Sequence, residues 1–392
     1  MTRPRPATPT AEHVDRYCAL YRDLFANVRH FEQFTALHLG LLAQTQRKSL
    51  PQIARVTGTD PQALHHFLSS TSWSVERLRA RRLDLLRRAL DGAPFILCIE
   101  DTGNAKKGTS TDYVARQYIG NLHTTTNGLV SVDAYGILGT ATFPLLSRIY
   151  KPEARLAPGE LYQTKPRIAF DLLGEISARG FASRIVLTDS FYGQSGQFIA
   201  ALRQAGLGYA LTMRSNVGGW MLPGQQTRAT RWRRFDPQSS KATGERRYLR
   251  ELVFGARRMV RCYEIAPEIA PDGEHVPTET TWRLMTDRPG KVEEVVGSAT
   301  ELKTAIEYGY KHAKDMLGWA DFRLMDAASI ERWWEIVMSA HLLVSLHSPP
   351  FSTYASSPNS PASTHPPTSR SAAQRDLAWA EQLDRVRLLL TR

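Results

Sequence analysis

Two continuous apolar segments, each ending in an aspartate, most constrain the fold of this 392-residue chain. They are PFILCIED at 94–101 and the start of SRIVLTDSFYG at 183–193. Apolar runs without polar alternation are typical of strands buried on both faces of a sheet. Amphipathic helices ending in glycine are predicted at 166–180 and 196–206. Because antiparallel-type strands come first and helices and strands then alternate, we expect an α/β sheet of mixed direction.

Changes of pattern divide the rest of the chain into segments. We expect a helical N-terminal domain at 1–90, an α/β domain at 91–215 with its last helices at 291–346, a β-rich insertion at 216–290, a disordered Pro/Ser linker at 347–372 and a C-terminal helix at 373–392. The linker is too poor in apolar residues to order itself. The last helix is expected to dock on the body of the protein, with a dimer contact as the alternative.

Residues 48–70 have the pattern of a helix-turn-helix. Gly58 falls where the tight turn needs a positive φ angle, and Asp60 is placed to cap the second helix. Gln62, His65 and His66 then fall nearer the outer face, where a recognition helix meets base edges. The alternative is a pair of packed helices in an all-α domain, without a role in DNA binding.

Basic residues outnumber acidic ones by 50 to 38, which gives a formal net charge of +12, and 40 of the 50 are arginine. Arginine pairs bidentately with phosphate and with guanine, so an acidic macromolecule such as nucleic acid is the expected partner. An arginine-rich proteome would produce the same excess without such a partner. The basic helix predicted at 77–90 suits phosphate contacts and a solvated surface equally well.

Other classes of protein lack support. No apolar stretch is long enough to span a membrane, and the N-terminus has no apolar signal region. The three cysteines lie too far apart for a CxxC zinc pair and are odd in number, which argues against a structural zinc site and a disulfide framework. A reduced cytoplasmic protein is therefore expected. The zinc-hydrolase motif HExxH and the nucleotide-binding motifs GxGxxG and GxxxxGK[ST] are all absent.

The chemistry is expected at Asp101 and Asp189, each at the end of an apolar strand. If these strands are neighbours, both carboxylates emerge at one edge of the sheet, where their repulsion favours a divalent cation such as Mg²⁺. A third carboxylate is expected from a packed helix, and Glu307 in AIEYGYKHAKD is the candidate. Asp133 is either an auxiliary acid or a hydrogen-bonded structural residue, and we favour the second interpretation.

Lysines accompany the third acid on its predicted helix. Lys303, Lys311 and Lys314 fall near the same helical face as Glu307, at spacings of three or four residues. An acid among lysines fits a metal-and-phosphate site. It fits an exposed ladder of salt bridges equally well on spacing alone.

Three motifs in this order, DTGNAKKG, TDSFYG and IEYGYKHAKDMLGW, with a β-rich insertion between the second and third, resemble the DDE transposases of bacterial insertion sequences. The seven-hundred-and-one group is the nearest branch, and the resemblance covers roughly residues 15–346. It implies an RNase H-like catalytic domain in which Asp101, Asp189 and Glu307 are the catalytic acids and metal ligands. Related enzymes carry a Tyr, Arg, Glu and Lys signature on the third-acid helix, whereas this chain has Lys303 at the Arg position and Thr300 at the Tyr position.

The resemblance further implies two-metal phosphoryl transfer with two Mg²⁺ ions per site, for which Mn²⁺ can substitute. The DNA partners would be the terminal repeats of the element and the target DNA, bound by a nucleoid-associated protein that dimerises when the ends are paired. Basic residues of the motifs and of the insertion would contact the DNA: Lys106, Lys107, Lys303, Lys311, Lys314, Arg231, Arg233 and Arg234. Three alternatives stay open: a catalytically idle, transposase-derived DNA-binding protein, an RNase H-like nuclease without strand transfer, and acids that are purely structural.

Overall fold

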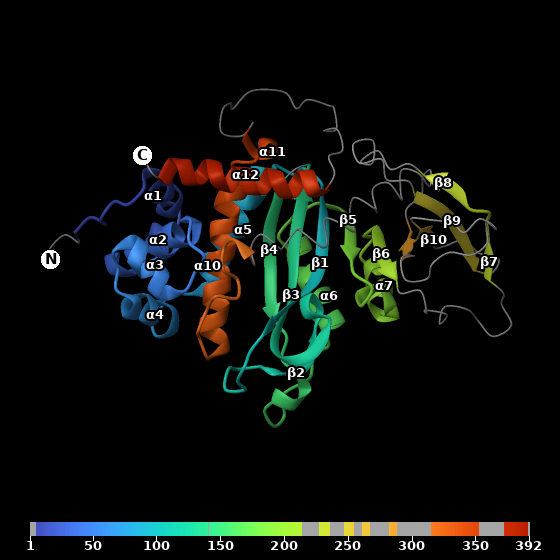
Figure 1. Cartoon of the computed structure of the whole chain (residues 1–392), viewed down its shortest axis with the longest axis horizontal. Coiled ribbons are helices and arrows are strands. Elements are labelled where there is room, and N and C mark those ends of the chain that lie inside the picture. Colours follow the sequence, from blue (N-terminus) through green and yellow to red (C-terminus); the bar gives the residue numbers. More distant parts are fainter. Residues whose placement is uncertain are drawn as a thin grey trace.

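The structure is a computed structural model, shown in Figure 1, in which N-terminal helices, a central sheet and a set of β strands follow one another across the molecule. It describes residues 5–139, 141–213, 227–235, 247–254, 261–266, 282–287, 315–352 and 372–390.

The N-terminal domain is helical, as predicted. Its elements are α1 (Glu12–Ala19), η1 (Arg22–Leu24), α2 (Val28–Leu42), α3 (Leu50–Thr57), α4 (Pro61–Ser69) and α5 (Val75–Leu90). Gly58 ends α3 with a φ angle of 69°, and the Asp60 carboxylate accepts hydrogen bonds from the backbone N–H groups of Gln62 and Ala63. Local capping chemistry therefore forms the helix-turn-helix, in which Leu64, Phe67 and Leu68 face the core.

Five strands form the central sheet in the order β4-β3-β1-β5-β6. Their bounds are β1 (Phe95–Ala105), β3 (Thr124–Leu138), β4 (Ala141–Ile149), β5 (Ser183–Thr188) and β6 (Tyr209–Met213). β1 pairs antiparallel with β3 and parallel with β5, and β5 pairs parallel with β6. This is the RNase H-like mixed sheet that the sequence predicts. A short strand, β2 (Ala115–Ile119), pairs with β3 and leads into η2 (Gly120–Leu122).

The β-rich insertion continues the central sheet. Its strands are β7 (Thr227–Ala229), β8 (Arg233–Phe235), β9 (Arg247–Phe254), β10 (Arg261–Ala266) and β11 (Trp282–Thr286). β11 pairs antiparallel with β6, and β10, β9 and β7 follow in order, while β8 pairs with β9. Without β11, β6 would be an open edge of the sheet. The pairing with β11 therefore satisfies backbone hydrogen-bonding groups of β6 that would otherwise be unpaired.

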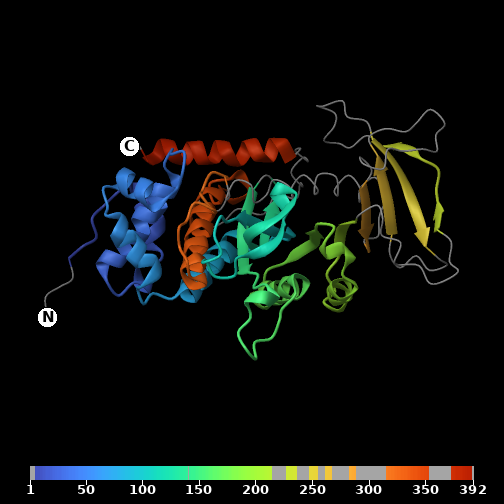
Figure 2. The ribbon, with the colours of Figure 1, turned by 60° about the horizontal axis from the view of Figure 1, so that its bottom comes forward.

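Helices cover both faces of the sheet (Figure 2). On one face, α6 (Lys165–Ala178) and α7 (Gly196–Gln204) share a buried cluster with Leu97 and Ile99 of β1. On the other face, α10 (Ala327–Ser345) and the N-terminal helices share a cluster with Cys98. Short 3₁₀ helices, η3 (Glu153–Arg155) and η4 (Tyr192–Gln194), lie in the connections before α6 and α7.

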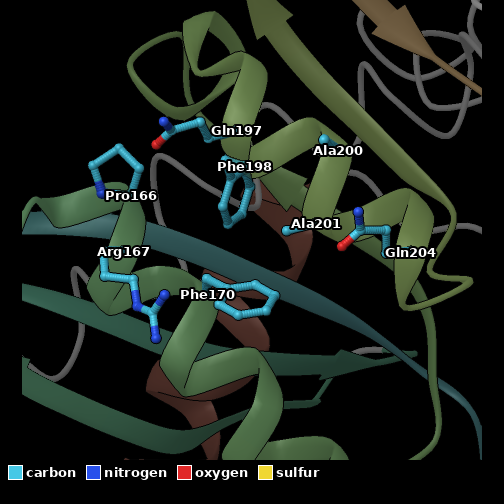
Figure 3. A pocket seen from close by; sticks show the side chains of 8 residues that line it. All are labelled: Pro166, Arg167, Phe170, Gln197, Phe198, Ala200, Ala201 and Gln204. Atoms are coloured by element: carbon cyan, nitrogen blue, oxygen red, sulfur yellow. The ribbon is translucent and has the colours of Figure 1, made fainter.

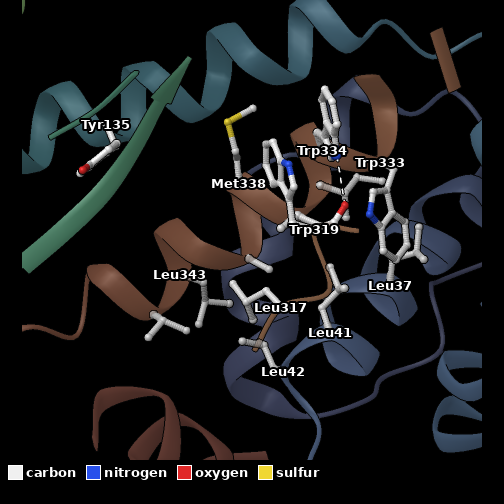
Figure 4. Close-up of a cluster of buried hydrophobic side chains, with 14 of the residues drawn as sticks. Leu37, Leu41, Leu42, Tyr135, Leu317, Trp319, Trp333, Trp334, Met338 and Leu343 are labelled. Atoms are coloured by element: carbon white, nitrogen blue, oxygen red, sulfur yellow. Dashed lines mark hydrogen bonds between the residues drawn. The ribbon is translucent and has the colours of Figure 1, made fainter. Parts of the chain in front are cut away.

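The segment that follows the third motif is anchored in the N-terminal domain. The indole rings of Trp319 and Trp334 stack at 4.8 Å, and Leu317 lies in the same cluster as Leu41 and Leu42 of α2 (Figure 4). The backbone N–H of Lys48 also donates to Asp321 at 2.7 Å. The N-terminal domain and the α/β domain therefore share one core.

The C-terminal helix α12 (Ala372–Leu390) docks on the body, as expected. Trp379, Leu383 and Val386 are buried in the cluster that contains the N-terminal helices. The predicted linker begins later than expected, because α11 (Pro349–Ser352) follows α10 and buries Phe351 against Phe143. The rest of the linker, 353–371, lies outside the described residues. Within the described part of the chain, no helix is both long and apolar enough to cross a membrane.

Candidate active site

Asp101 lies inside β1, four residues before the strand ends at Ala105, so its expected place at the strand end is wrong. The reason is the long antiparallel pairing with β3, which continues from Asp101 opposite Val132 to Ala105 opposite Gly128. Since side chains alternate along a strand, Asp101 shares the face of Ile99, which α6 and α7 cover. By the same alternation, the neighbouring Glu100 lies on the opposite face.

Asp189 follows directly after β5, as predicted. The parallel register places Ile99 of β1 beside Thr188, so Asp101 and Asp189 emerge from neighbouring strands. Oδ1 of Asp189 accepts hydrogen bonds from the backbone N–H groups of Phe191 at 3.0 Å and Tyr192 at 3.4 Å. The turn that follows β5 therefore fixes the orientation of this carboxylate.

Gly193 lets this turn approach β6. A Cβ atom at Gly193 would lie 2.5 Å from the backbone oxygen of Thr212, so a larger residue would push the turn away. The glycine of the TDSFYG motif thus has a packing role that supports the position of Asp189.

The two carboxylates influence each other electrostatically. Burial, and next the negative charge of Asp101, raise the pKa of Asp189 from 3.8 to about 6. Backbone hydrogen bonds from the turn and the charge of Lys165 oppose this rise in the pKa only in part. Two carboxylates that disfavour each other's negative charge in this way would both be stabilised by a cation bound between them.

Two further residues bind Asp101, and neither was predicted from the sequence. Nζ of Lys165 donates to Oδ2 of Asp101 at 2.7 Å, and the hydroxyl of Tyr192 donates to Oδ1. The Lys165 side chain is 16% exposed and that of Asp101 is 22% exposed, so the contact is largely shielded from solvent. One signal for Lys165 was present in the sequence: it directly precedes the helix predicted at 166–180, where the positive end of the helix dipole disfavours a cation and a nearby acid would stabilise it.

Asp133 has a structural environment. Oδ2 accepts from Ser131 Oγ at 3.0 Å and Oδ1 from Ser147 Oγ at 2.5 Å, and the residue is fully buried. It lies opposite Glu100 in the β1–β3 register and so shares the face away from Asp101. This arrangement supports the structural interpretation.

The third predicted acid lies outside the described residues, as do the lysines around it: Glu307, Lys303, Lys311 and Lys314. Among the residues that the structure describes, no group of three or more His, Cys, Asp and Glu side chains is arranged to hold a metal.

The other predicted DNA contacts are spread over the molecule. Lys106 Nζ lies 3.7 Å from the centroid of the Phe322 ring, and burial lowers the pKa of Lys106, whereas Lys107 is exposed. Three exposed arginines of the insertion lie at or next to β8: Arg231, Arg233 and Arg234. In the sheet order, β6, β11, β10 and β9 separate β8 from β5. The structure therefore does not bring these arginines beside Asp101 and Asp189.

Two arginines of the basic helix α5 are buried, which neither interpretation of this helix foresaw. Arg79 and Arg82 pair with Glu335 of α10, and both Arg82 and Glu335 are fully buried. Arg82 also donates to the backbone oxygens of Pro144 and Leu145 at 2.9 Å each. These arginines join α5, α10 and β4 instead of facing phosphate or solvent.

A cavity of about 630 Å³ borders the helix-turn-helix. Gln62 and His65 line it from α4, while Arg47 and the 320–323 segment line other sides. Gln62, His65 and Arg47 are exposed, as is Arg323 of the 320–323 segment. We call this cavity, which also includes Ser49, Leu50, Pro51 and Pro61, the α4 groove.

A second pocket, of about 370 Å³, lies between α6 and α7 (Figure 3). Phe170 and Phe198 line it, and Arg167 is its charged lining residue. Since no acid lines this pocket, it is distinct from the site of Asp101 and Asp189.

Comparisons with known proteins agree with the motifs. A family model described as DDE superfamily endonuclease matches residues 21–251, a range that contains Asp101 and Asp189 and ends before Glu307. A probable transposase for insertion sequence element IS701 from Microchaete diplosiphon is 44% identical over 333 residues, covering 84% of this chain and 87% of that protein. The cryo-EM structure of a piggyBac transposase synaptic complex with hairpin DNA matches 97% of this chain and 77% of its own, with 12% identity and a TM-score of 0.46.

Proposed function

Because the chain belongs to the DDE superfamily of endonucleases and to the insertion-sequence transposases within it, we propose that it binds the ends of its element and catalyses Mg²⁺-dependent DNA cleavage and strand transfer. The observation that carries this proposal is the acid pair on neighbouring parallel strands. Asp101 and Asp189 lie close enough for the charge of the first to raise the pKa of the second.

The residues present fit a divalent cation. Carboxylate oxygens are the ligands that Mg²⁺ prefers. One of these oxygens, Oδ2 of Asp101, already binds a positive group, the ammonium of Lys165. We propose that Asp101 and Asp189 hold the metal together with Glu307. Bound Mg²⁺ supplies activation of the attacking hydroxyl group and neutralisation of the leaving oxygen in phosphoryl transfer.

The chain's own residues position this chemistry. The turn after β5 fixes Asp189 through two backbone N–H groups, and the Tyr192 hydroxyl orients Asp101. β1 and β5 are central strands with neighbours on both sides, so the backbones that carry the acids are rigid. A site that acts on a phosphodiester needs its metal-binding carboxylates held in a fixed geometry, and these strands provide that support.

We assign recognition of the element ends to α4. Gln62 and His65 project from its first turns into the α4 groove, where Arg47 and Arg323 supply positive charge. Amide and imidazole groups can read base edges, while the arginines can bind backbone phosphates. The exposed Lys107 and the arginines of β8 would extend the phosphate contacts beyond the groove.

A strand-transfer assay separates this proposal from its alternatives. Purified protein is mixed with a DNA fragment that carries the element end and with a supercoiled target plasmid, in the presence of Mg²⁺ or Mn²⁺. The proposal predicts cleaved ends and plasmid joined to them. Cleavage without joined product would identify a nuclease, and binding without cleavage would identify a transposase-derived DNA-binding protein. Light scattering of the complex with paired ends tests the expected homodimer.

A further inference from the structure

Lys165 occupies an unusual place for a lysine. It is the first residue of α6, immediately before Pro166, where the partial positive charge of the helix N-terminus disfavours a cation. Its ammonium lies 2.7 Å from Oδ2 of Asp101, 5.2 Å from the centroid of the Tyr150 ring and 5.4 Å from that of Phe191. The charge of Asp101 and the two ring faces offset the cost of placing a largely shielded ammonium there.

The contact uses a carboxylate oxygen that the proposed function needs. Tyr192 already binds Oδ1 of Asp101, so Lys165 completes the coordination of this carboxylate by the chain itself. An ammonium and a divalent ion that require the same oxygen compete for it. The four-carbon stem of lysine lets the ammonium leave without movement of the helix, which a bidentate arginine would not do as readily.

When Lys165 leaves Asp101 in a DNA complex, its ammonium can bind a phosphate group of the DNA instead. The acid pair is where the reacting phosphate would lie, and a phosphate oxygen can replace the carboxylate oxygen as acceptor of the ammonium. The partly exposed Phe191 and Tyr150 rings would keep the lysine near the acids during this exchange. The expected ligand of the displaced Lys165 ammonium is therefore a negatively charged oxygen of a phosphodiester.

We propose that Lys165 is an active-site lysine that neutralises Asp101 in the metal-free protein, releases Oδ2 when the divalent ion binds, and then binds the phosphate of the strand to be cut. This inference rests on the proposed function. Beyond the three acids, it assigns to the site a positively charged group, the Lys165 ammonium. This group binds the Asp101 carboxylate in the metal-free protein and the DNA phosphate in the complex.

Metal binding in the absence of DNA tests whether the Lys165 ammonium competes with the divalent ion for Asp101. Titration of the full chain with Mn²⁺, followed by electron paramagnetic resonance, gives the affinity of wild type and of Lys165→Met. Loss of the competing ammonium should tighten Mn²⁺ binding by about fivefold, the size of one partly exposed ion pair. The matched control is Lys151→Met, which breaks the ion pair with the Glu160 side chain and should leave the affinity unchanged.

The salt dependence of DNA binding tests whether Lys165 binds a phosphate of the DNA. Binding of an element-end fragment is measured at several salt concentrations with Ca²⁺ in place of Mg²⁺. One lost phosphate contact should reduce the slope of log K against log salt by about 1 in Lys165→Met. The control Lys151→Met is measured alongside.

Two results would overturn the inference while leaving the proposed function intact. Weaker Mn²⁺ binding by Lys165→Met, with wild type still cutting DNA, would show that the ammonium only holds Asp101 in place. An unchanged salt slope would show that Lys165 does not bind phosphate. A wild-type protein that neither binds Mn²⁺ nor cuts DNA would instead overturn the proposed function together with this inference.

Discussion

The hydroxyl of Tyr192 donates a hydrogen bond to Asp101, while the backbone N–H of Tyr192 lies 3.4 Å from the carboxylate of Asp189. One residue of the turn after β5 therefore contacts both acids of the candidate site. The geometry of Asp101 depends on a turn that is 91 residues away in the sequence.

Removal of this hydroxyl should weaken the site without unfolding the protein. In Tyr192→Phe the buried ring stays in place, but Asp101 loses a hydrogen bond, and bonds to charged groups contribute about 1.5–3 kcal/mol. We expect Mg²⁺-dependent nicking to fall by about tenfold in a protein that still folds, with a melting temperature a few degrees below that of wild type. Tyr118→Phe, at an exposed tyrosine outside the acid site, is the control. Nicking at the wild-type rate would contradict the positioning role of Tyr192.

The raised pKa of Asp189 makes stability depend on pH in the absence of metal. Because its pKa is about 6 in the folded protein against 3.8 ordinarily, the folded state holds this proton more tightly than the unfolded state. Stability is therefore lost as the pH rises from about 4 to about 6. At 1.36 kcal/mol per pKa unit, the loss above this window is at most about 3 kcal/mol.

Asp189→Asn removes this loss. With EDTA present, urea unfolding at pH 7.5 should show that the variant is more stable than wild type, whereas at pH 4 the difference should vanish. Added Mg²⁺ should stabilise wild type at pH 7.5 and leave Asp189→Asn unaffected. A variant that is less stable than wild type at pH 7.5 would show that the negative charge of Asp189 is favourable in the metal-free fold.

The buried pair of Arg82 and Glu335 should be essential for stability. Glu335→Gln removes the negative charge that pairs with the buried guanidinium of Arg82, whereas Arg79 keeps its ion pair with Glu331. Breaking a buried pair costs about 3–5 kcal/mol. Asp84→Asn breaks two exposed ion pairs and should cost less than about 1 kcal/mol. Denaturant unfolding compares the two variants, and equal losses would contradict the structural role of Glu335.

The α4 groove should determine sequence-specific binding. We expect Gln62→Ala and His65→Ala to weaken binding to the element end by about tenfold each, because a base contact is worth about 1–3 kcal/mol. Binding to unrelated DNA should not change. His66→Ala is the matched control, because His66 is exposed on the same helix but does not line the groove. Equal weakening on both DNA sequences would assign Gln62 and His65 to phosphate contact instead.

The features that the sequence predicts correctly are local ones. The cap at Asp60, the positive φ angle of Gly58 and the strand that delivers Asp189 each depend on neighbours a few residues away. Capping groups, glycine conformations and apolar runs leave a signature within one element, so a reader of the sequence can find them.

The features that the sequence did not predict depend on distant partners. Lys165 meets Asp101 across 64 residues, and Arg82 meets Glu335 across 253. Nothing near Arg82 distinguishes it from the exposed arginines of the same helix, and the pairing of β11 with β6 has no local signature either. These contacts exist only once the sheet and α10 have come together.

Mg²⁺-dependent nicking of DNA that carries the element boundary tests the central claim most directly. Wild type is compared with Asp101→Asn, Asp189→Asn and Glu307→Gln, and with Asp133→Asn as a control from the opposite face of the sheet. We predict that wild type and the control nick at the boundary, while the three acid variants bind the same DNA without cutting it. Nicking by any of the three acid variants at the wild-type rate would contradict the three-acid account.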